Sequence, residues 1–205
     1  MTARPTIAVL DYGIGNLGSA CKALERVGAT ALLVTNRSQA EAADGVVLPG
    51  VGAFGACMEA LESSGLDVVA LDAAASGRPF LGVCVGMQLL FDGSDELPGR
   101  QGLGVISGMV RWLPDTVKRP QMQWNRLHPT RSDPLLDGLD DAWVYFVHSF
   151  HAIPANMSTV AATCQYGTQV TAAVRQDNVF ATQFHPEKSG RDGLQLLANF
   201  VAVCS

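Results

Sequence analysis

The first hundred residues alternate short apolar runs with longer amphipathic stretches. The apolar runs lie between turn residues and are apolar on both faces, a pattern typical of buried strands. We expect such strands at Thr6–Leu10, Ala31–Val34, Gly45–Leu48 and Pro79–Cys84. The amphipathic stretches predict helices at Asn16–Val27, Ala53–Ser63, Leu66–Ala75 and Gly86–Phe91. This β-α-β-α order predicts a parallel sheet covered by helices on both faces, with ligands bound beyond the carboxyl ends of its strands.

The pattern changes at Gly102, where short strand-like segments begin to follow one another with turn residues between them. Such segments predict a more antiparallel region, with strands at Val105–Leu113, Gln121–His128, Trp143–His151, Thr159–Gln165, Gln169–Arg175 and Val179–Phe184. A final helix is expected at Gly190–Val203. We find no internal repeat, low-complexity tract or linker. Residues 1–205 therefore predict a single α/β domain with a mostly parallel central sheet.

Composition narrows the range of partners. The 205 residues are 48% hydrophobic but only 16% charged, against roughly 25% charged in an average soluble domain. Either a large core or a partly buried outer face explains this deficit. The net charge of −5 argues against nucleic acid as a partner, because binding a phosphate backbone needs a basic stripe. No apolar run reaches membrane-spanning length and no basic leader precedes a cleavage site, so we expect a cytoplasmic protein without a membrane partner.

Five cysteines are scattered along the chain without a CxxC pair. This arrangement predicts neither a disulfide framework nor a zinc site, and the odd number leaves at least one thiol free. His148 and His151 are three residues apart on one predicted strand, where their side chains would point to opposite faces. We therefore expect no bound metal, and the role of His148 stays open.

A glycine-rich turn, Asp11–Gly18, joins the first predicted strand to the first helix. Gly13, Gly15 and Gly18 have the spacing of a dinucleotide-binding turn. The second strand, however, ends without the acidic residue that would bind a ribose hydroxyl. The pattern favours a tight turn with Asn16 as the helix N-cap, and no cofactor is expected.

Cys84 stands at a second junction between a strand and a helix, with Gly82 and Gly86 on either side. This G-x-C-x-G spacing has the geometry of a nucleophile elbow, in which small neighbours permit the strained turn that lifts one side chain above the sheet. A buried cysteine in a glycine-relieved turn is the alternative.

His185-Pro-Glu187 follows the last predicted strand. The carboxylate can orient the imidazole through one ring nitrogen while the other nitrogen faces a thiol, as in a catalytic triad. A helix cap or a salt bridge is the alternative for this motif taken alone.

The loop Leu48–Phe54 carries glycines on both sides of Val51. Such a loop can present a peptide N–H into a cleft, as an oxyanion hole requires. A plain connection between strand and helix is the alternative.

Taken together, these motifs closely resemble those of the class I (triad) glutamine amidotransferases over nearly the whole chain. Pro49–Gly52, Gly82–Gln88 and Phe184–Glu187 match the family's oxyanion strand, nucleophile elbow and triad turn, in that order. The resemblance implies a flavodoxin-like α/β fold.

The resemblance also implies a mechanism. Cys84 attacks the side-chain carboxamide of glutamine, and His185, oriented by Glu187, carries the proton to the departing ammonia. The expected oxyanion donors are the amides of Val51, Gly52 and Val85. The expected contacts to glutamine are Gly50, Gln88, Ser149 and Phe150.

Further motifs, including Tyr12–Asn16, Met122–Asn125 and Tyr145–Ser149, are similar to those of the glutaminase subunits of imidazole glycerol phosphate synthase, an enzyme of histidine biosynthesis. This similarity implies a heterodimer in which ammonia passes to a (β/α)₈-barrel cyclase subunit. The expected interface comprises Tyr12, Gly13, Asn16, Met122, Trp124, Asn125 and Lys188.

Three positions depart from that pattern without removing a triad group. Gln123 stands where glycine is frequent, Val85 where leucine is usual and Phe150 where tyrosine is common. Three other functions remain open from the residues alone: an amidotransferase of another synthase, a stand-alone γ-glutamyl hydrolase or cysteine peptidase, and a non-catalytic module with a vestigial pocket.

Overall fold

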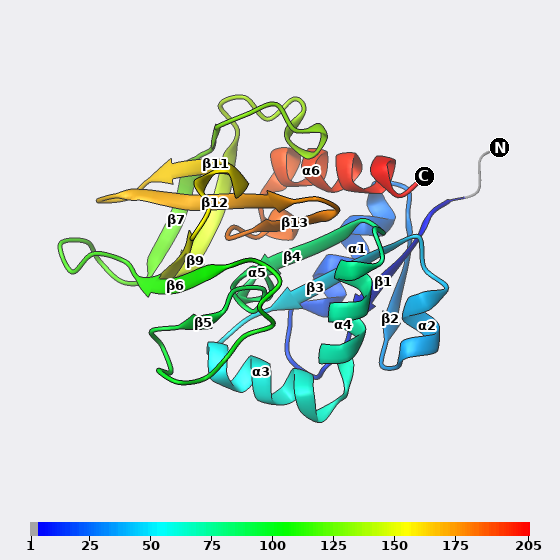
Figure 1. Cartoon of the computed structure of the whole chain (residues 1–205). Helices are drawn as coiled ribbons and strands as arrows, with labels where there is room; N and C mark the ends of the chain where they lie inside the picture. Colours follow the sequence, from blue (N-terminus) through cyan, green and yellow to red (C-terminus); the bar gives the residue numbers. More distant parts are fainter. Residues whose placement is uncertain (1–3) are drawn as a thin grey trace.

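One eight-stranded sheet runs through the computed structural model, which describes residues 4–205 (Figure 1). Its strands lie in the order β2-β1-β3-β4-β13-β12-β11-β8. Their bounds are β1 Thr6–Leu10, β2 Thr30–Val34, β3 Gly45–Gly50, β4 Phe80–Cys84, β8 His128–Pro129, β11 Val160–Gln165, β12 Gln169–Gln176 and β13 Val179–Thr182.

The sheet divides into a parallel and an antiparallel part. Strands β2, β1, β3, β4 and β13 pair in parallel, whereas β12, β11 and β8 continue the sheet with antiparallel pairing. The predicted α/β class with a mostly parallel central sheet is therefore confirmed. β13 was expected in the antiparallel region, but it pairs in parallel with β4 on one side and antiparallel with β12 on the other. It thus joins the two parts.

Helices cover both faces of the parallel part. α1 (Leu17–Arg26) and α6 (Gly190–Val203) pack together on one face, and α3 (Phe54–Ser63) and α4 (Leu66–Ala75) pack together on the other (Figure 1). The predicted helix Gly86–Phe91 is instead the single turn α5 (Val85–Gln88), which begins directly after β4. Among residues 4–205, no helix has both the length and the apolar character that crossing a bilayer requires.

Two further sheets flank the carboxyl ends of the parallel strands. One contains β10 (Phe150–Pro154), β6 (Gly108–Trp112) and β5 (Gly93–Ser94), and the other pairs β7 (Gln121–Arg126) with β9 (Trp143–His148). Within residues 4–205 there are also three short 3-10 helices, Pro134–Leu136, Met157–Thr159 and Pro186–Lys188.

The single strand predicted at Trp143–His151 is wrong, because the chain changes sheets at Ser149. Buried and less buried residues alternate up to Phe150, but His151 and Ala152 are then buried in succession. This loss of the two-residue period marks the place where β9 ends and β10 begins.

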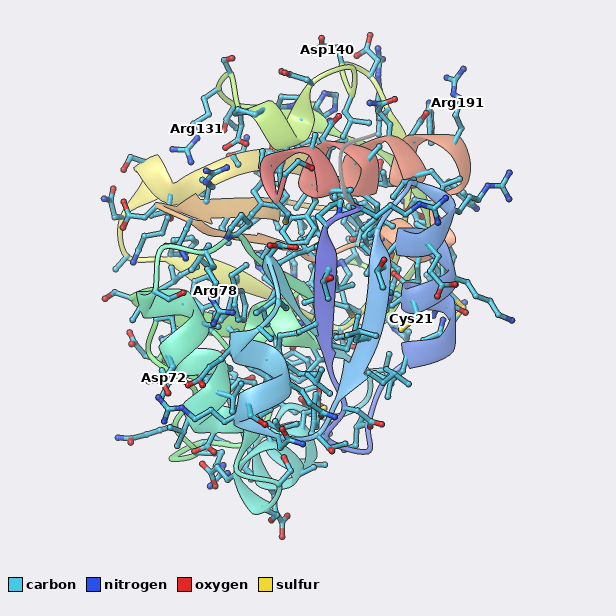
Figure 2. The ribbon with its side chains drawn as sticks, turned by 90° about the vertical axis from the view of Figure 1, so that its right-hand side faces the viewer. Cys21, Asp72, Arg78, Arg131, Asp140 and Arg191 are labelled. Carbon is cyan, nitrogen blue, oxygen red and sulfur yellow. The ribbon has the colours of Figure 1, made fainter. Side chains whose placement is uncertain are left out.

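The expectation that Ala31–Val34 is buried on both faces is also wrong. β2 is the edge strand of the sheet, and the side chains of Leu32 and Leu33 are 45% and 47% exposed. Figure 2 views the molecule from the side of this edge.

The short helix α2 (Arg37–Glu41) follows β2 and was not predicted. The Asn36 side chain accepts a hydrogen bond from the amide of Gln39 and so caps its first turn. The Arg78 guanidinium, labelled in Figure 2, donates to the carbonyls of Ala40 and Ala43 at 2.6 and 3.1 Å and stabilises its end. Five residues are too few to show a helical period.

A close backbone crossing joins the end of β3 to the start of α5. A Cβ atom placed on Gly86 would lie 1.9 Å from the Leu48 carbonyl oxygen, and one on Gly50 would lie 2.6 Å from the amide nitrogen of Gly86. Both positions therefore require glycine because the atoms that a side chain would strike belong to the backbone.

We predict that Gly86→Ala destabilises the fold by about 2 kcal/mol or more, as overpacking a rigid contact does. Gly18→Ala is the matched control, because Gly18 lies in α1 and a Cβ there meets no atom within 4 Å. Urea unfolding followed by circular dichroism measures the stability of each variant. Equal unfolding midpoints for the two variants would contradict the requirement for glycine at position 86.

Candidate active site

The carboxyl ends of β3, β4 and β13 bring the predicted catalytic segments together. Gly50 is the register partner of Cys84 across β3 and β4, and Thr182 is the partner of Val83 across β13 and β4. The oxyanion loop, the nucleophile and the His-Pro-Glu turn therefore leave three adjacent strands at the same sheet edge, where open α/β sheets bind ligands.

Cys84 occupies a strained turn at the end of β4. Its backbone has φ of 55° and ψ of −110°, in a region that residues with a side chain rarely adopt. The strand ends and α5 begins within one residue, so the turn lifts the thiol above the sheet edge. The residue is 3% exposed.

Glu187 orients His185. The imidazole Nδ1 lies 2.8 Å from the Glu187 Oε1, and both side chains are almost fully buried. The backbone around His185 is held in turn: its amide donates to the Tyr145 carbonyl, and its carbonyl accepts a hydrogen bond from the Ser189 hydroxyl. The second ring nitrogen is thereby left for the Cys84 thiol, which lines the same cavity as His185.

Opposing effects set the pKa of His185. Burial lowers it, but the hydrogen bonds and negative charges of Cys84 and Glu187 outweigh burial and raise the pKa to about 9. The imidazole therefore holds its proton at neutral pH when the thiolate faces it. An imidazolium in this position can deliver a proton to a leaving group.

Val51 and Gly52 follow β3 and lie against Cys84, together with Val85, on the wall of one cavity. Gly52 has φ of 90°, which only glycine adopts without strain. Val85 is the first residue of α5, and the first amides of a helix have no partner within it. The structure thus brings the three predicted oxyanion donors to the nucleophile.

The cavity has a volume of about 330 Å³, and the Cys84 thiol and the His185 imidazole lie in its wall. Gln88, Ser149 and Phe150, the expected contacts to glutamine, also line it. Gly50 lies directly beneath, buried against α5. Gln88 is itself fixed, because its amide donates to the Phe150 carbonyl at 3.3 Å and to the Gln183 Oε1 at 3.1 Å.

Two residues of the site were missed in the sequence. Gln183 is fully buried, and its amide nitrogen lies 3.9 Å from the Cys84 sulfur. A polar side chain next to the Phe184–Glu187 motif was an available signal. Glu96 also lines the cavity and accepts a hydrogen bond from the Phe54 amide at 2.7 Å. It lies in a loop whose local pattern carried no signal.

His148 lies in the cavity wall, 6% exposed. Its Nδ1 contacts the Phe150 carbonyl at 2.7 Å, which makes Nδ1 the donor and leaves Nε2 as an acceptor. Burial lowers the pKa of His148 to about 4 and also lowers that of His151, so both rings are neutral at pH 7. Within residues 4–205 we find no group of three or more His, Cys, Asp or Glu side chains arranged to hold a metal ion.

The predicted interface residues differ in accessibility. Met122 and Trp124 project from β7 and are 62% and 47% exposed, and Lys188 is exposed at the rim of the cavity. Gly13 is exposed and Asn16 is half-buried at the start of α1, where its side chain makes no capping hydrogen bond. The Asn125 amide donates to the Gln165 carbonyl, whereas Tyr12 is only 5% exposed. The Tyr12 side chain thus lies beneath the surface.

The sequence of this chain is similar to a known protein family and to named relatives. The model of the family described as glutamine amidotransferase class-I matches residues 8–204. The chain belongs to this family. Among its relatives is the imidazole glycerol phosphate synthase subunit HisH of Methanothermobacter thermautotrophicus, 49% identical over 96% of this chain and 98% of the relative. The protein of the same name from Nostoc punctiforme is 50% identical over 97% of this chain and 96% of the relative.

Solved structures match the fold of the amidotransferase. A crystal structure of a glutamine amidotransferase superposes with a TM-score of 0.77 at 21% identity, covering 97% of this chain and 98% of the other. A chain of PurLQS from Thermotoga maritima gives a TM-score of 0.77 at 19% identity, with 98% and 99% covered. The fold is thus shared with proteins of low sequence identity.

We predict that Glu187→Gln moves the alkaline fall of kcat/KM for glutamine to lower pH by about one unit or more. The reason is that Glu187 stabilises the imidazolium, so its removal lowers the His185 pKa from about 9. Ammonia release measured between about pH 6 and 10 tests this, since kcat/KM reports the groups of the free enzyme. Glu62→Gln, on the exposed face of α3, is the control. An unshifted profile would contradict the orienting role of Glu187.

Proposed function

We propose that this chain is the glutaminase subunit of imidazole glycerol phosphate synthase, hydrolysing glutamine to glutamate and ammonia. The observation that carries the proposal is that Cys84 and His185 line one cavity, while the Glu187 Oε1 lies 2.8 Å from the His185 Nδ1. The choice of this synthase rests on the two HisH relatives, which match this chain over nearly their whole length.

In the proposed mechanism, the Cys84 thiolate attacks the carboxamide carbon of glutamine. The C–S bond forms as the carbonyl π electrons move to oxygen, and the amides of Val51, Gly52 and Val85 stabilise the resulting oxyanion. The intermediate collapses when the C–N bond breaks and His185 gives its proton to the leaving nitrogen. Water, deprotonated by His185, then hydrolyses the γ-glutamyl thioester.

The cavity offers distinct groups to the amino-acid end of glutamine. Glu96 is an acidic lining side chain that can attract the α-ammonium, and Lys188 lies at the rim with the opposite charge. Ser149, between β9 and β10, and Phe150, the first residue of β10, also line the cavity. Gln88 fixes the Phe150 carbonyl, so its removal would disturb this part of the pocket.

We propose the (β/α)₈-barrel cyclase subunit as the partner, forming a heterodimer in the cytoplasm. One face of β7 and β9 carries the exposed side chains of Met122, Trp124 and Trp143. Exposed large apolar side chains gathered on one face are typical of a protein interface. Lys188 lies nearby at the rim of the glutamine cavity, which would place the interface beside the site where ammonia forms.

We predict that Cys84→Ala abolishes release of ammonia from glutamine, because no nucleophile remains to form the thioester. Cys164→Ala, which removes a buried thiol from β11, is the control and is expected to retain activity. Both are assayed with and without the cyclase subunit and its nucleotide ligand. We expect weak basal activity that rises on binding. Undiminished turnover by the Cys84 variant would overturn the triad, and activity on γ-glutamyl peptides alone would favour a hydrolase.

We further predict that Trp124→Ala weakens binding of the cyclase subunit by about thirtyfold, the effect of losing an aromatic anchor near the centre of an interface. Leu32→Ala is the control, because it removes an exposed apolar side chain from the opposite edge of the fold. Calorimetric titration with the cyclase subunit measures the affinity of each variant. Equal affinities for the two variants would contradict the assignment of this face.

A further inference from the structure

Two buried side chains outside the triad hold the oxyanion loop. The Tyr12 hydroxyl donates to the Pro49 carbonyl at 2.7 Å, and the Cys57 thiol donates to the Val51 carbonyl at 3.2 Å. Tyr12 lies in the turn after β1, and Cys57 lies in the first turn of α3. The two bonded carbonyls flank the peptide that joins Gly50 to Val51.

Both donors keep their protons at neutral pH. Tyr12 is 5% exposed and Cys57 is fully buried. Burial raises the pKa of the Tyr12 phenol and that of the Cys57 thiol above their ordinary values. Each group therefore remains a donor under conditions in which Cys84 reacts.

Peptide geometry turns these two bonds into a constraint on the predicted oxyanion donors. In a planar trans peptide the C=O and N–H groups point in opposite directions. Holding the Val51 carbonyl therefore fixes the direction of the Gly52 N–H. Holding the Pro49 carbonyl fixes the peptide on the other side, so the Val51 N–H belongs to a peptide between two anchored neighbours.

The constraint matters because the loop is otherwise free to rotate. Gly50 and Gly52 flank Val51, and glycine has the widest choice of backbone conformations. An oxyanion donor is effective only when it is oriented before the charge develops. The loop needs glycine for space, since a Cβ atom on Gly50 would lie 3.0 Å from the Tyr12 hydroxyl. Its orientation must therefore come from contacts outside the loop.

We propose that Tyr12 and Cys57 are positioning residues of the glutaminase reaction, which hold the Pro49–Gly52 loop with its amides directed toward the oxyanion. This inference rests on the proposed function. Neither side chain lines the cavity, so neither is assigned a contact with glutamine.

The test compares Cys57→Ala, Cys57→Ser and Tyr12→Phe in the complex with the cyclase subunit. We expect Cys57→Ala and Tyr12→Phe each to lower kcat about three- to tenfold, the effect of one lost hydrogen bond. KM should change by less than about twofold, because the bonds act on the transition state. Cys57→Ser retains a donor and should recover most of the rate. The controls Cys164→Ala and Tyr166→Phe remove a thiol and a hydroxyl from elsewhere in the fold.

A second measurement separates positioning from general damage. Iodoacetamide alkylates Cys84 by displacement at a saturated carbon, a reaction that forms no oxyanion. We expect Cys57→Ala and Tyr12→Phe to leave the alkylation rate of Cys84, followed by mass spectrometry of its peptide, unchanged. Alkylation slowed in proportion to turnover, or a kcat equal to that of the unmodified chain, would overturn the inference. An unmodified complex that releases no ammonia from glutamine would instead overturn the proposed function.

Discussion

The active site depends on one backbone contact, the crossing of the end of β3 over the first turn of α5. The Gly86 backbone approaches the Leu48 carbonyl so closely that no Cβ atom fits between them, and Gly50 meets the Gly86 amide in the same way. This approach places the oxyanion loop against Cys84. Cys84 adopts a strained φ of 55° because the chain must turn from strand to helix at this single residue.

Parallel pairing of β13 with β4 brings His185 and Glu187 to the same sheet edge as Cys84. Because the two strands run in the same direction, the turn that follows β13 emerges at the same edge as the elbow that follows β4. The His185 backbone is then tied to Tyr145 in β9 and to Ser189 before α6. The imidazole is thus oriented by a rigid frame as well as by Glu187, which favours a site organised before substrate binds.

Local patterns allowed most of the parallel sheet to be predicted, together with the three motifs that meet at its carboxyl edge. Buried strands such as β1 have a continuous apolar pattern, and G-x-C-x-G marks a tight turn wherever it occurs. The errors arose where the outcome depends on distant residues. β2 has the composition of a buried strand but became an edge, and Trp143–His151 was divided between two sheets. Gln183 contacts Gln88 and Cys84, which lie far away in the sequence. Its place next to the Phe184–Glu187 motif could suggest a role, but no local pattern reveals these partners.

The low charge of the chain also has a structural explanation. The accessible surface is 8771 Å², close to the roughly 9,200 Å² expected for a monomer of this mass. An unusually small surface therefore does not account for a charged fraction of 16%. Part of the shortage of charged residues is at the surface. The face of β7 and β9 carries the exposed apolar side chains of Met122 and Trp124 instead. Val147 pairs with Met122 and also lines the glutamine cavity, so this face continues into the cavity wall. A subunit that buries the face would consequently also restrict the route by which water and ammonia exchange with solvent.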